Sequence, residues 1–212
     1  MAAKGNTKQE ILDAALELFS MQGYEATAIS QIAEAVGLRK ASIYSHFENK
    51  QAILDALIQN TLEQYEKHSI FAQADWDDSS FTSGKENMTP EMAAEMFLGQ
   101  IRYILHDPQI RRARKMLIIE QFQNRQMAQL QTKQNYTDVM RYFTGLVRFL
   151  IGQGRLIGHD PELMAAELCL PISVWINLCD REPEWEVEAM QLIERHIRHF
   201  FEQYQTKPGN RF

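Results

Sequence analysis

Apolar residues recur along this chain at the three-to-four-residue spacing of helices, and no segment shows the alternating pattern of a strand. The pattern predicts about nine helices, which glycines, prolines and polar stretches separate. Their expected ranges are about 7–22, 28–36, 40–47, 50–65, 90–106, 108–123, 125–154, 161–180 and 184–204. The predicted fold class is therefore all-α, and the polar stretch at 72–90 is expected to be a loop.

The second and third predicted helices are short and follow each other closely. Thr27 is the expected N-cap of the second helix, and Gly37 ends it. The third helix, about 40–47, turns Ile43 and Phe47 inward. Two short helices joined by a tight turn and packed on a preceding helix form a helix-turn-helix, so this motif is predicted here.

The outward face of the third helix has the chemistry that a DNA groove requires. A major groove is roughly 12 Å wide and admits one helix, whose exposed residues must be small, polar or basic. Small side chains allow close approach, while lysine and serine donate to base edges or phosphates. The outward residues expected here are Arg39, Lys40, Ala41, Ser42, Ser45 and His46.

The stretch GYEATAISQIAEAVGLRKASIYSHFENKQAILDAL, residues 23–57, resembles the DNA-binding domain of the TetR family of repressors. The resemblance covers roughly the first quarter of the chain. The sequence departs from the family pattern at Ala28, where a hydroxyl residue is usual, and at Ser30, where a basic residue is common. The matching residues are Gly23, Tyr24, Thr27, Ile32, Ala33, Val36, Gly37, Ile43, Tyr44, His46, Phe47 and Lys50.

The resemblance implies an N-terminal three-helix DNA-binding domain over 1–50 and a larger C-terminal effector-binding and dimerisation domain over 51–212. By position, Lys40 is the first candidate for reading bases, because lysine donates to guanine O6 and N7. Ala41, Ser42 and Ser45 are also expected to face bases, and Thr27, Tyr44, His46 and Lys50 to contact phosphates. The alternatives are an N-cap role for Thr27, packing for Tyr44, and ordinary exposed side chains for His46 and the lysines.

The resemblance also implies that the last two helices pair with those of a second copy into a homodimer. A two-fold dimer reads a palindromic operator. The alternative is that these apolar side chains form the core of a single chain. The residues expected at the dimer interface are Leu168, Trp175, Met190, Ile193, Ile197, Phe200, Phe201 and Tyr204.

The middle helices carry the aromatic and methionine side chains that suit an adaptable apolar pocket for an unknown small-molecule effector. The alternative is ordinary core packing. The basic residues between 111 and 115 are interpreted as a solvated helix face rather than an anion site. The candidate effector-binding residues are Phe97, Tyr103, Met116, Ile119, Phe122, Tyr136, Met140 and Phe143.

Composition refines this picture. The 22 Lys+Arg against 28 Asp+Glu give a net charge of −6, which counts against a large nucleic-acid footprint. The first six residues show no leader pattern, no apolar run is judged long enough to span a bilayer, and no membrane partner is expected.

Cys169 and Cys179 are about 15 Å apart on one predicted helix, too far for a disulfide. The expected location is the cytoplasm, with reduced core thiols.

An enzyme is the rival class, but the sequence lacks a glycine-rich phosphate loop, a His-Glu-x-x-His helix and a nucleophile elbow. His196 and His199 share a helix face with basic neighbours, which disfavours a bound cation. No enzyme activity, cofactor or metal is expected. The predicted function is sequence-specific transcriptional regulation, most simply repression relieved by a small molecule. The alternatives are a ligand-responsive activator and a helical dimer without specific DNA binding.

Overall fold

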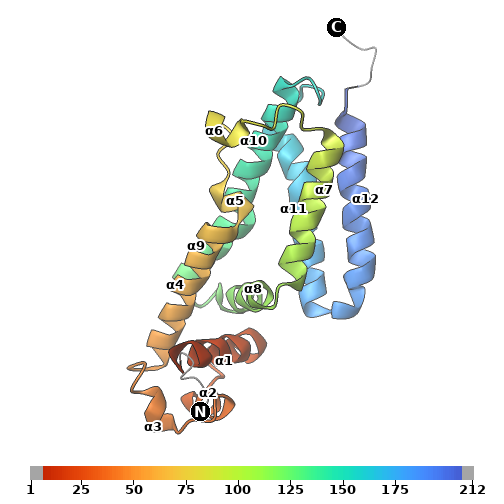
Figure 1. Cartoon of the computed structure of the whole chain (residues 1–212). Helices are drawn as coiled ribbons and strands as arrows, with labels where there is room; N and C mark the ends of the chain where they lie inside the picture. The colour runs from red at the N-terminus through yellow and green to blue at the C-terminus, as the bar shows by residue number, and fades with distance from the viewer. Residues whose placement is uncertain (1–6, 207–212) are drawn as a thin grey trace, which may run out of the picture. The chain divides into compact units, whose positions relative to one another are not determined.

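The structure, a computed structural model, describes residues 7–206, and its regular elements in this range are helices apart from one β-bridge between Leu156 and Gln205 (Figure 1). The all-α prediction is confirmed. Residues 1–6, for which no leader pattern was predicted, lie outside the described residues. The helices are α1 (Thr7–Gln22), α2 (Ile29–Ala35), α3 (Lys40–Ile43), α4 (Lys50–His68), α5 (Ile70–Gln73), α6 (Ser79–Thr82), α7 (Pro90–His106), α8 (Pro108–Glu120), α9 (Arg125–Thr132), the π-helix η1 (Lys133–Thr137), α10 (Asp138–Gly152), α11 (Pro161–Arg181), the 3-10 helix η2 (Pro183–Trp185) and α12 (Glu186–Tyr204).

The helices group into two compact units that do not follow chain order. Unit 1 contains α1 to α4 together with α8 and α9, and unit 2 contains α5 to α7 and the segment from η1 to the end of α12. The predicted helix 125–154 is divided at this border by the π-helix η1. The functional division into residues 1–50 and 51–212 stays a prediction.

The core of unit 1 joins the N-terminal helices to two helices from later in the chain. Ile32 of α2, Ile43 of α3 and Ile53 of α4 are fully buried around α1. The same apolar cluster includes four side chains of α8 and α9, namely Met116, Leu117, Met127 and Leu130. The three-helix domain is therefore completed by α8 and α9, because their apolar faces cover α1 and α4.

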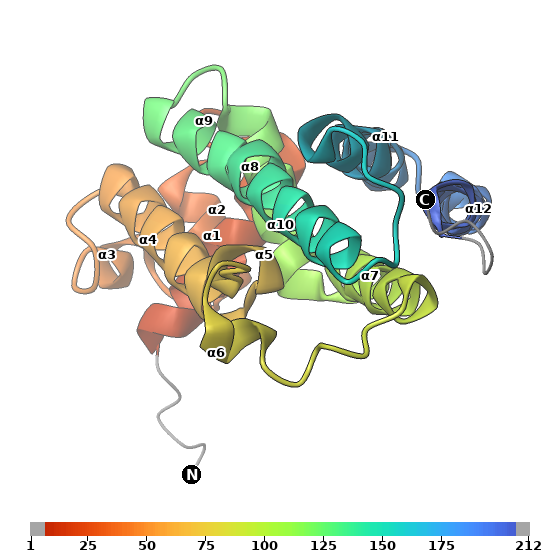
Figure 2. The ribbon, with the colours of Figure 1, turned by 90° about the horizontal axis from the view of Figure 1, so that it is seen from above.

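Unit 2 is built on four long helices that run side by side, α7, α10, α11 and α12 (Figure 2). Pro90 and Pro161 start α7 and α11 at a position where proline loses no intrahelical hydrogen bond. Thr89 and Asp160 cap these helices by accepting backbone N–H bonds from the first turn. The caps and prolines fix where each long helix begins.

Most of the residues expected at a dimer interface lie inside unit 2. Five of them are no more than 4% exposed, and the other three are half-buried against the same core. The five buried residues pack as the alternative interpretation expects, in the core of a single chain, since buried side chains offer no surface to a second copy. The interface role of the three half-buried residues stays a prediction. The five buried residues are Leu168, Ile193, Ile197, Phe200 and Phe201, and the three half-buried ones are Trp175, Met190 and Tyr204.

The segment expected to be a loop at 72–90 is only partly irregular. It contains the end of α5 and the single-turn helix α6. Ser69 and Asp78 cap these two turns by accepting from Phe71 N–H and Ser80 N–H. The polar composition that predicted a loop therefore also supplies helix caps, which stabilise turns too short to show a helical period.

Helix α11 corrects the expectation that no apolar stretch reaches membrane-spanning length. Its 21 residues are long and apolar enough to qualify by length and composition alone. Only a third of that stretch is buried, although Leu168 and Ile172 pack in the core of unit 2. The other side presents apolar residues to the surroundings, including Leu163 at 70% and Val174 at 64% exposure.

Candidate nucleic-acid interface

The turn between α1 and α2 sets the direction of the helix-turn-helix and depends on Gly23. This residue has φ of +84°, a left-handed conformation that glycine adopts without strain. A Cβ at this position would lie 3.1 Å from Glu120 Oε1 and 3.3 Å from Ile119 Cγ2. Gly23 therefore both ends α1 and allows α8 to approach the turn.

Thr27 is a buried part of this turn and not the N-cap of α2. Ala28 occupies the cap position, and its N–H donates to Gln31 Oε1 at 2.7 Å. The Thr27 hydroxyl donates to Gly23 O at 2.7 Å and accepts from Gln22 Nε2 at 3.0 Å, with the residue 1% exposed. The N-cap prediction was wrong, because the threonine hydroxyl bonds backward to α1 instead of forward to α2.

Lys50 also holds the turn from within. Its Nζ donates to Tyr24 O at 2.7 Å and to Thr27 O at 3.0 Å. The same ammonium lies 4.0 Å from the centroid of the Tyr24 ring, a cation-π contact. Two of its three donors are thus used inside unit 1. The predicted phosphate contact of Lys50 stays untested, and the structure gives this lysine a positioning role.

The third helix is a single turn, shorter than the predicted 40–47, but the orientation of its residues follows the pattern. Ile43 and Phe47 point into the core at 0% and 6% exposure. The small and polar residues lie on the other side, and Ser45 Oγ donates to Ser42 O at 2.7 Å. The exposed or half-exposed candidates for DNA contact are Lys40, Ala41, Ser42, Tyr44, Ser45 and His46.

Two further cations lie at this face and were not named among the predicted contacts. Arg39 is exposed directly before α3. Lys8 of α1 is exposed and its Nζ lies 5.3 Å from the Phe47 ring centroid, so a residue thirty-nine positions away lies beside the end of the motif. Only folding reveals Lys8, since nothing in its local sequence connects it to α3. Arg39 and Lys40 are therefore exposed cations at the start of α3, and Lys8 is an exposed cation beside Phe47.

Helix α8 contributes a buried carboxylate to the turn. Glu120 is 6% exposed, and its Oε1 accepts from Tyr24 N–H at 2.7 Å. Burial, together with the charges of Glu25, Asp55 and Glu120, raises the pKa of the Tyr24 phenol. The phenol therefore stays protonated, and its hydroxyl donates to Gln51 Oε1 at 3.2 Å. The turn is thus bonded to α4 by Lys50 and to α8 by Glu120.

The eight candidate effector residues do not gather at one site. Three of them belong to unit 1, where Met116 is buried in the core while Ile119 and Phe122 are 41% and 87% exposed. In unit 2, Phe97 and Phe143 stack with centroids 4.3 Å apart. The remaining three are the half-buried Met140 and the exposed Tyr103 and Tyr136.

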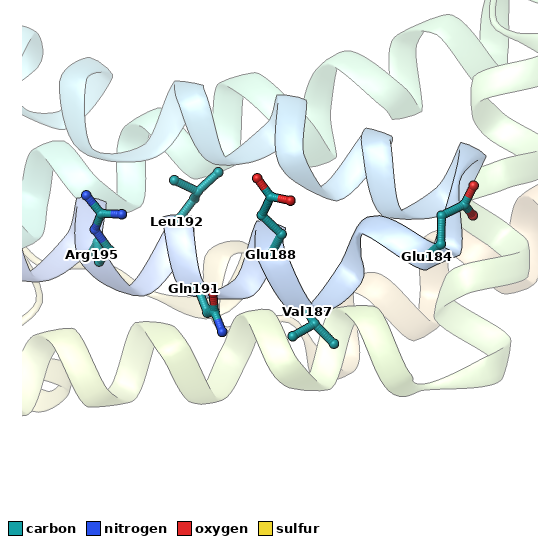
Figure 3. A pocket seen from close by; sticks show the side chains of 6 residues that line it. All are labelled: Glu184, Val187, Glu188, Gln191, Leu192 and Arg195. Atoms are coloured by element: carbon teal, nitrogen blue, oxygen red, sulfur yellow. The ribbon is translucent and has the colours of Figure 1, made fainter.

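A shallow depression of about 410 Å³ lies along α12, and it has the wrong lining for an apolar effector (Figure 3). Three of its six residues are charged and none is aromatic. Its lining consists of Glu184, Val187, Glu188, Gln191, Leu192 and Arg195.

The described residues contain no cluster of three or more His, Cys, Asp or Glu side chains that could hold a metal. His196 Nε2 lies 3.0 Å from both Glu167 O and Leu168 O, so this ring bonds to backbone. Cys169 and Cys179 are both buried, as predicted, and are not bonded to each other.

An exposed basic helix face on a rigid three-helix support defines a helix-turn-helix protein. Residues 11–57 match the sequence model of the bacterial regulatory proteins of the tetR family. The resemblance found in the sequence is confirmed, and this part of the chain is a TetR-family domain.

A curated relative matches the same region. The chain is 36% identical over 58 residues to the negative transcriptional regulator IcaR of the biofilm operon icaADBC of Staphylococcus epidermidis. This alignment covers 27% of the chain and only 31% of the relative, so the chain spans about a third of that protein's length.

Solved structures resemble the whole fold. A TetR-family regulator from Agrobacterium tumefaciens has a TM-score of 0.63 at 17% identity, covering 94% of this chain and 97% of its own. SmeT, a repressor of a multidrug efflux pump of Stenotrophomonas maltophilia, in complex with triclosan, has a TM-score of 0.61 at 20% identity, with 97% of each chain covered. At these identities the likeness establishes the fold.

Proposed function

We propose that this chain is a sequence-specific DNA-binding transcriptional regulator that represses transcription as a homodimer on a palindromic operator and is released by a small molecule. The observation that carries the proposal is the α3 face. Lys40, Ala41 and Ser42 are open to solvent there, while Ile43 and Phe47 hold the backbone beneath them. The match of residues 11–57 to a regulator family supports the same function.

Base reading is assigned to Lys40, with Ala41, Ser42 and Ser45 allowing the helix to enter the groove. Tyr44 and His46, both exposed at the end of the motif, are assigned to phosphates together with Lys8 and Arg39. Thr27 and Lys50 hold the turn, so their effect on affinity is indirect. Few phosphate contacts per protomer fit the acidic total charge, because a dimer doubles them.

A homodimer is supported by the exposed apolar side of α11. Leu163 and Val174 lie on this side, with the half-buried Pro171 and Leu178 at helical spacing between and beyond them. An apolar stripe of this length on a helix is usual at an interface and costly in water. We assign the interface to this stripe, in place of the buried residues expected from the sequence.

The test of the proposed function is selection of random DNA duplexes on the purified full-length protein, with the Lys40→Ala/Tyr44→Ala variant in parallel. The expected result is one enriched palindrome that is bound less tightly as salt rises and is lost in the variant. Arg102→Ala, which removes an exposed cation of α7, is the matched control and is expected to select the same palindrome.

Enrichment without a palindrome would overturn the dimer, and enrichment that survives the double substitution would overturn the assignment to α3. A selection that yields no sequence at any salt concentration would overturn DNA reading altogether and favour a helical dimer without specific DNA binding. Reporter transcription from the selected palindrome then separates repression from activation.

A further inference from the structure

Seven aromatic rings form a continuous cluster in unit 2, around one face of α10. Tyr142 and Phe143 of α10 are its buried centre at 3% and 0% exposure. Neighbouring ring centroids are 4.3 to 5.9 Å apart, mostly in the edge-to-face or tilted arrangements that aromatic pairs prefer. The other members are Phe71, Trp76, Phe81, Phe97 and Phe149.

Trp76 is a half-buried ring of this cluster and comes from the connection between α5 and α6. Its indole contacts Phe81, Tyr142 and Phe149 with centroid distances of 5.2, 5.6 and 5.4 Å. It lies against the backbone of α10 at Gly145, where a Cβ would be 2.6 Å from Trp76 Cγ and 2.7 Å from Trp76 Cβ. The indole therefore lies in an aromatic slot whose other rings meet it edge-to-face or tilted, at interplanar angles of 41° to 84°. The slot exists because residue 145 has no side chain.

The indole does not fit this slot chemically. Its Nε1 is buried and has no hydrogen-bond partner. A buried N–H without an acceptor destabilises the packed state, because the group has lost its bond to water. A flat ring of the same size without an N–H would fill the slot without this penalty.

The segment that carries Trp76 is attached to the rest of unit 2 by its apolar side chains and by few hydrogen bonds. The hydrogen bonds recorded for residues 75–88 join residues of that segment to one another, among them Ser80 N–H to Asp78 and Met88 N–H to Lys85 O. The segment is anchored at its start, where Arg141 Nη2 donates to Phe71 O at 3.1 Å. Segments with few non-local bonds open at low free-energy cost.

We propose that the slot over Gly145 is a ligand site for a flat, uncharged, bicyclic aromatic molecule and that Trp76 occupies it as an internal stand-in. The ligand replaces the indole between Tyr142, Phe149 and Phe81, and Trp76 moves out into water with its N–H solvated. The ring contacts of the indole are all aromatic, which favours an uncharged ligand. The Lys85 ammonium, 3.9 Å from the centroid of the Phe81 ring, disfavours a cationic one. The inference rests on the proposed function, since it names the effector class for that regulator.

The test uses benzofuran and indole, which differ in one ring atom, on the full-length protein labelled with 5-fluorotryptophan. The three tryptophans give three ¹⁹F resonances, and Trp76→Phe assigns the one of interest. Benzofuran is expected to move the Trp76 resonance to a solvent-exposed position. Calorimetry is expected to show at least fivefold tighter binding of benzofuran than of indole, because only indole carries the N–H.

Two variants test the mechanism of exchange. Trp76→Ala removes the stand-in and is expected to tighten benzofuran binding at least tenfold, since no protein state has to be displaced. Gly145→Ala places a methyl group in the slot and is expected to weaken binding at least tenfold and to expose Trp76 without ligand. Gly99→Ala, also inside a helix of unit 2 but with open space at the Cβ position, is the matched control and is expected to change neither.

The proposal is overturned if benzofuran leaves the Trp76 resonance in place, or if Gly145→Ala and Gly99→Ala bind it equally. These two readouts decide the question even if Trp76→Ala does not fold. Both measurements are made without DNA, so they are independent of operator binding. If benzofuran displaces Trp76 but the protein selects no operator, the ligand site stands and the proposed function is overturned.

Discussion

Two lysines of the helix-turn-helix, Lys40 and Lys50, have different surroundings although the sequence suggests DNA contact for both. Lys40 is exposed at the start of α3, whereas the Lys50 ammonium bonds the carbonyls of Tyr24 and Thr27. A surface cation that meets only solvent contributes little to stability. A donor shared by two part-buried carbonyls contributes more, because its loss leaves the acceptors unpaired.

Substitution of each lysine by alanine is expected to separate an effect on DNA affinity from an effect on the stability of the fold. Lys40→Ala should leave the free energy of unfolding unchanged and weaken binding to the selected duplex. Lys50→Ala should lower the free energy of unfolding by about 1–3 kcal/mol. Urea unfolding measures the stability of both variants, and titration with the selected duplex measures their affinity for DNA. Equal destabilisation by the two substitutions would contradict the positioning role of Lys50.

The buried thiol of Cys169 gives a pH-dependent prediction. Burial raises its pKa from 9.0 to about 12, so the native thiolate population at pH 8 is about a thousandfold below that of an unfolded thiol. Alkylation by iodoacetamide is expected to be slow in the native protein and ordinary in urea. The Cys169 thiol holds its proton more tightly in the native protein than in the unfolded chain. The stability that results from this difference in pKa is therefore complete below pH 9 and is lost between pH 9 and 12. A fast native reaction at pH 8 would be the contrary result.

At the scale of elements, α8 and the turn after α1 are joined by the bond from Tyr24 N–H to Glu120. Glu120→Ala leaves this N–H without its acceptor and is expected to lower stability by about 1–3 kcal/mol. Glu120→Gln retains an acceptor oxygen and should restore most of the loss. Thermal unfolding and duplex affinity of both variants provide the measurement. If glutamine destabilises as much as alanine, the carboxylate charge rather than the hydrogen bond is what matters.

Local signals predicted most elements, while contacts between distant segments escaped the sequence. The stripes of α1, α7 and α12 follow the helical period, and Asn49 caps α4 by accepting from Ala52 N–H. The helical period could not show that Met116 packs against α1. An apolar stripe indicates that one face of a helix is buried, but it does not identify the helix that covers this face. For the same reason Lys8 was missed and the core of unit 2 was assigned to an interface.

The whole molecule is expected to associate through the exposed apolar stripe of α11. Val174→Glu places a charge in that stripe and is expected to convert the dimer to a monomer. Met92→Glu, which alters a side chain of α7 that is 57% exposed, is the matched control and should leave the dimer intact. Sedimentation equilibrium at several protein concentrations measures both. A dimer that persists in Val174→Glu would mean that another surface holds the two copies together.

The discontinuous make-up of unit 1 restricts how such a regulator can be recombined. A fragment that ends after α4 lacks the four apolar side chains that α8 and α9 add to its core. A chimera that joins this N-terminal segment to a foreign effector domain must therefore receive matching residues from two later helices. Exchange of operator specificity between relatives is expected to succeed by grafting the exposed side chains of α3 and to fail by splicing at a single junction.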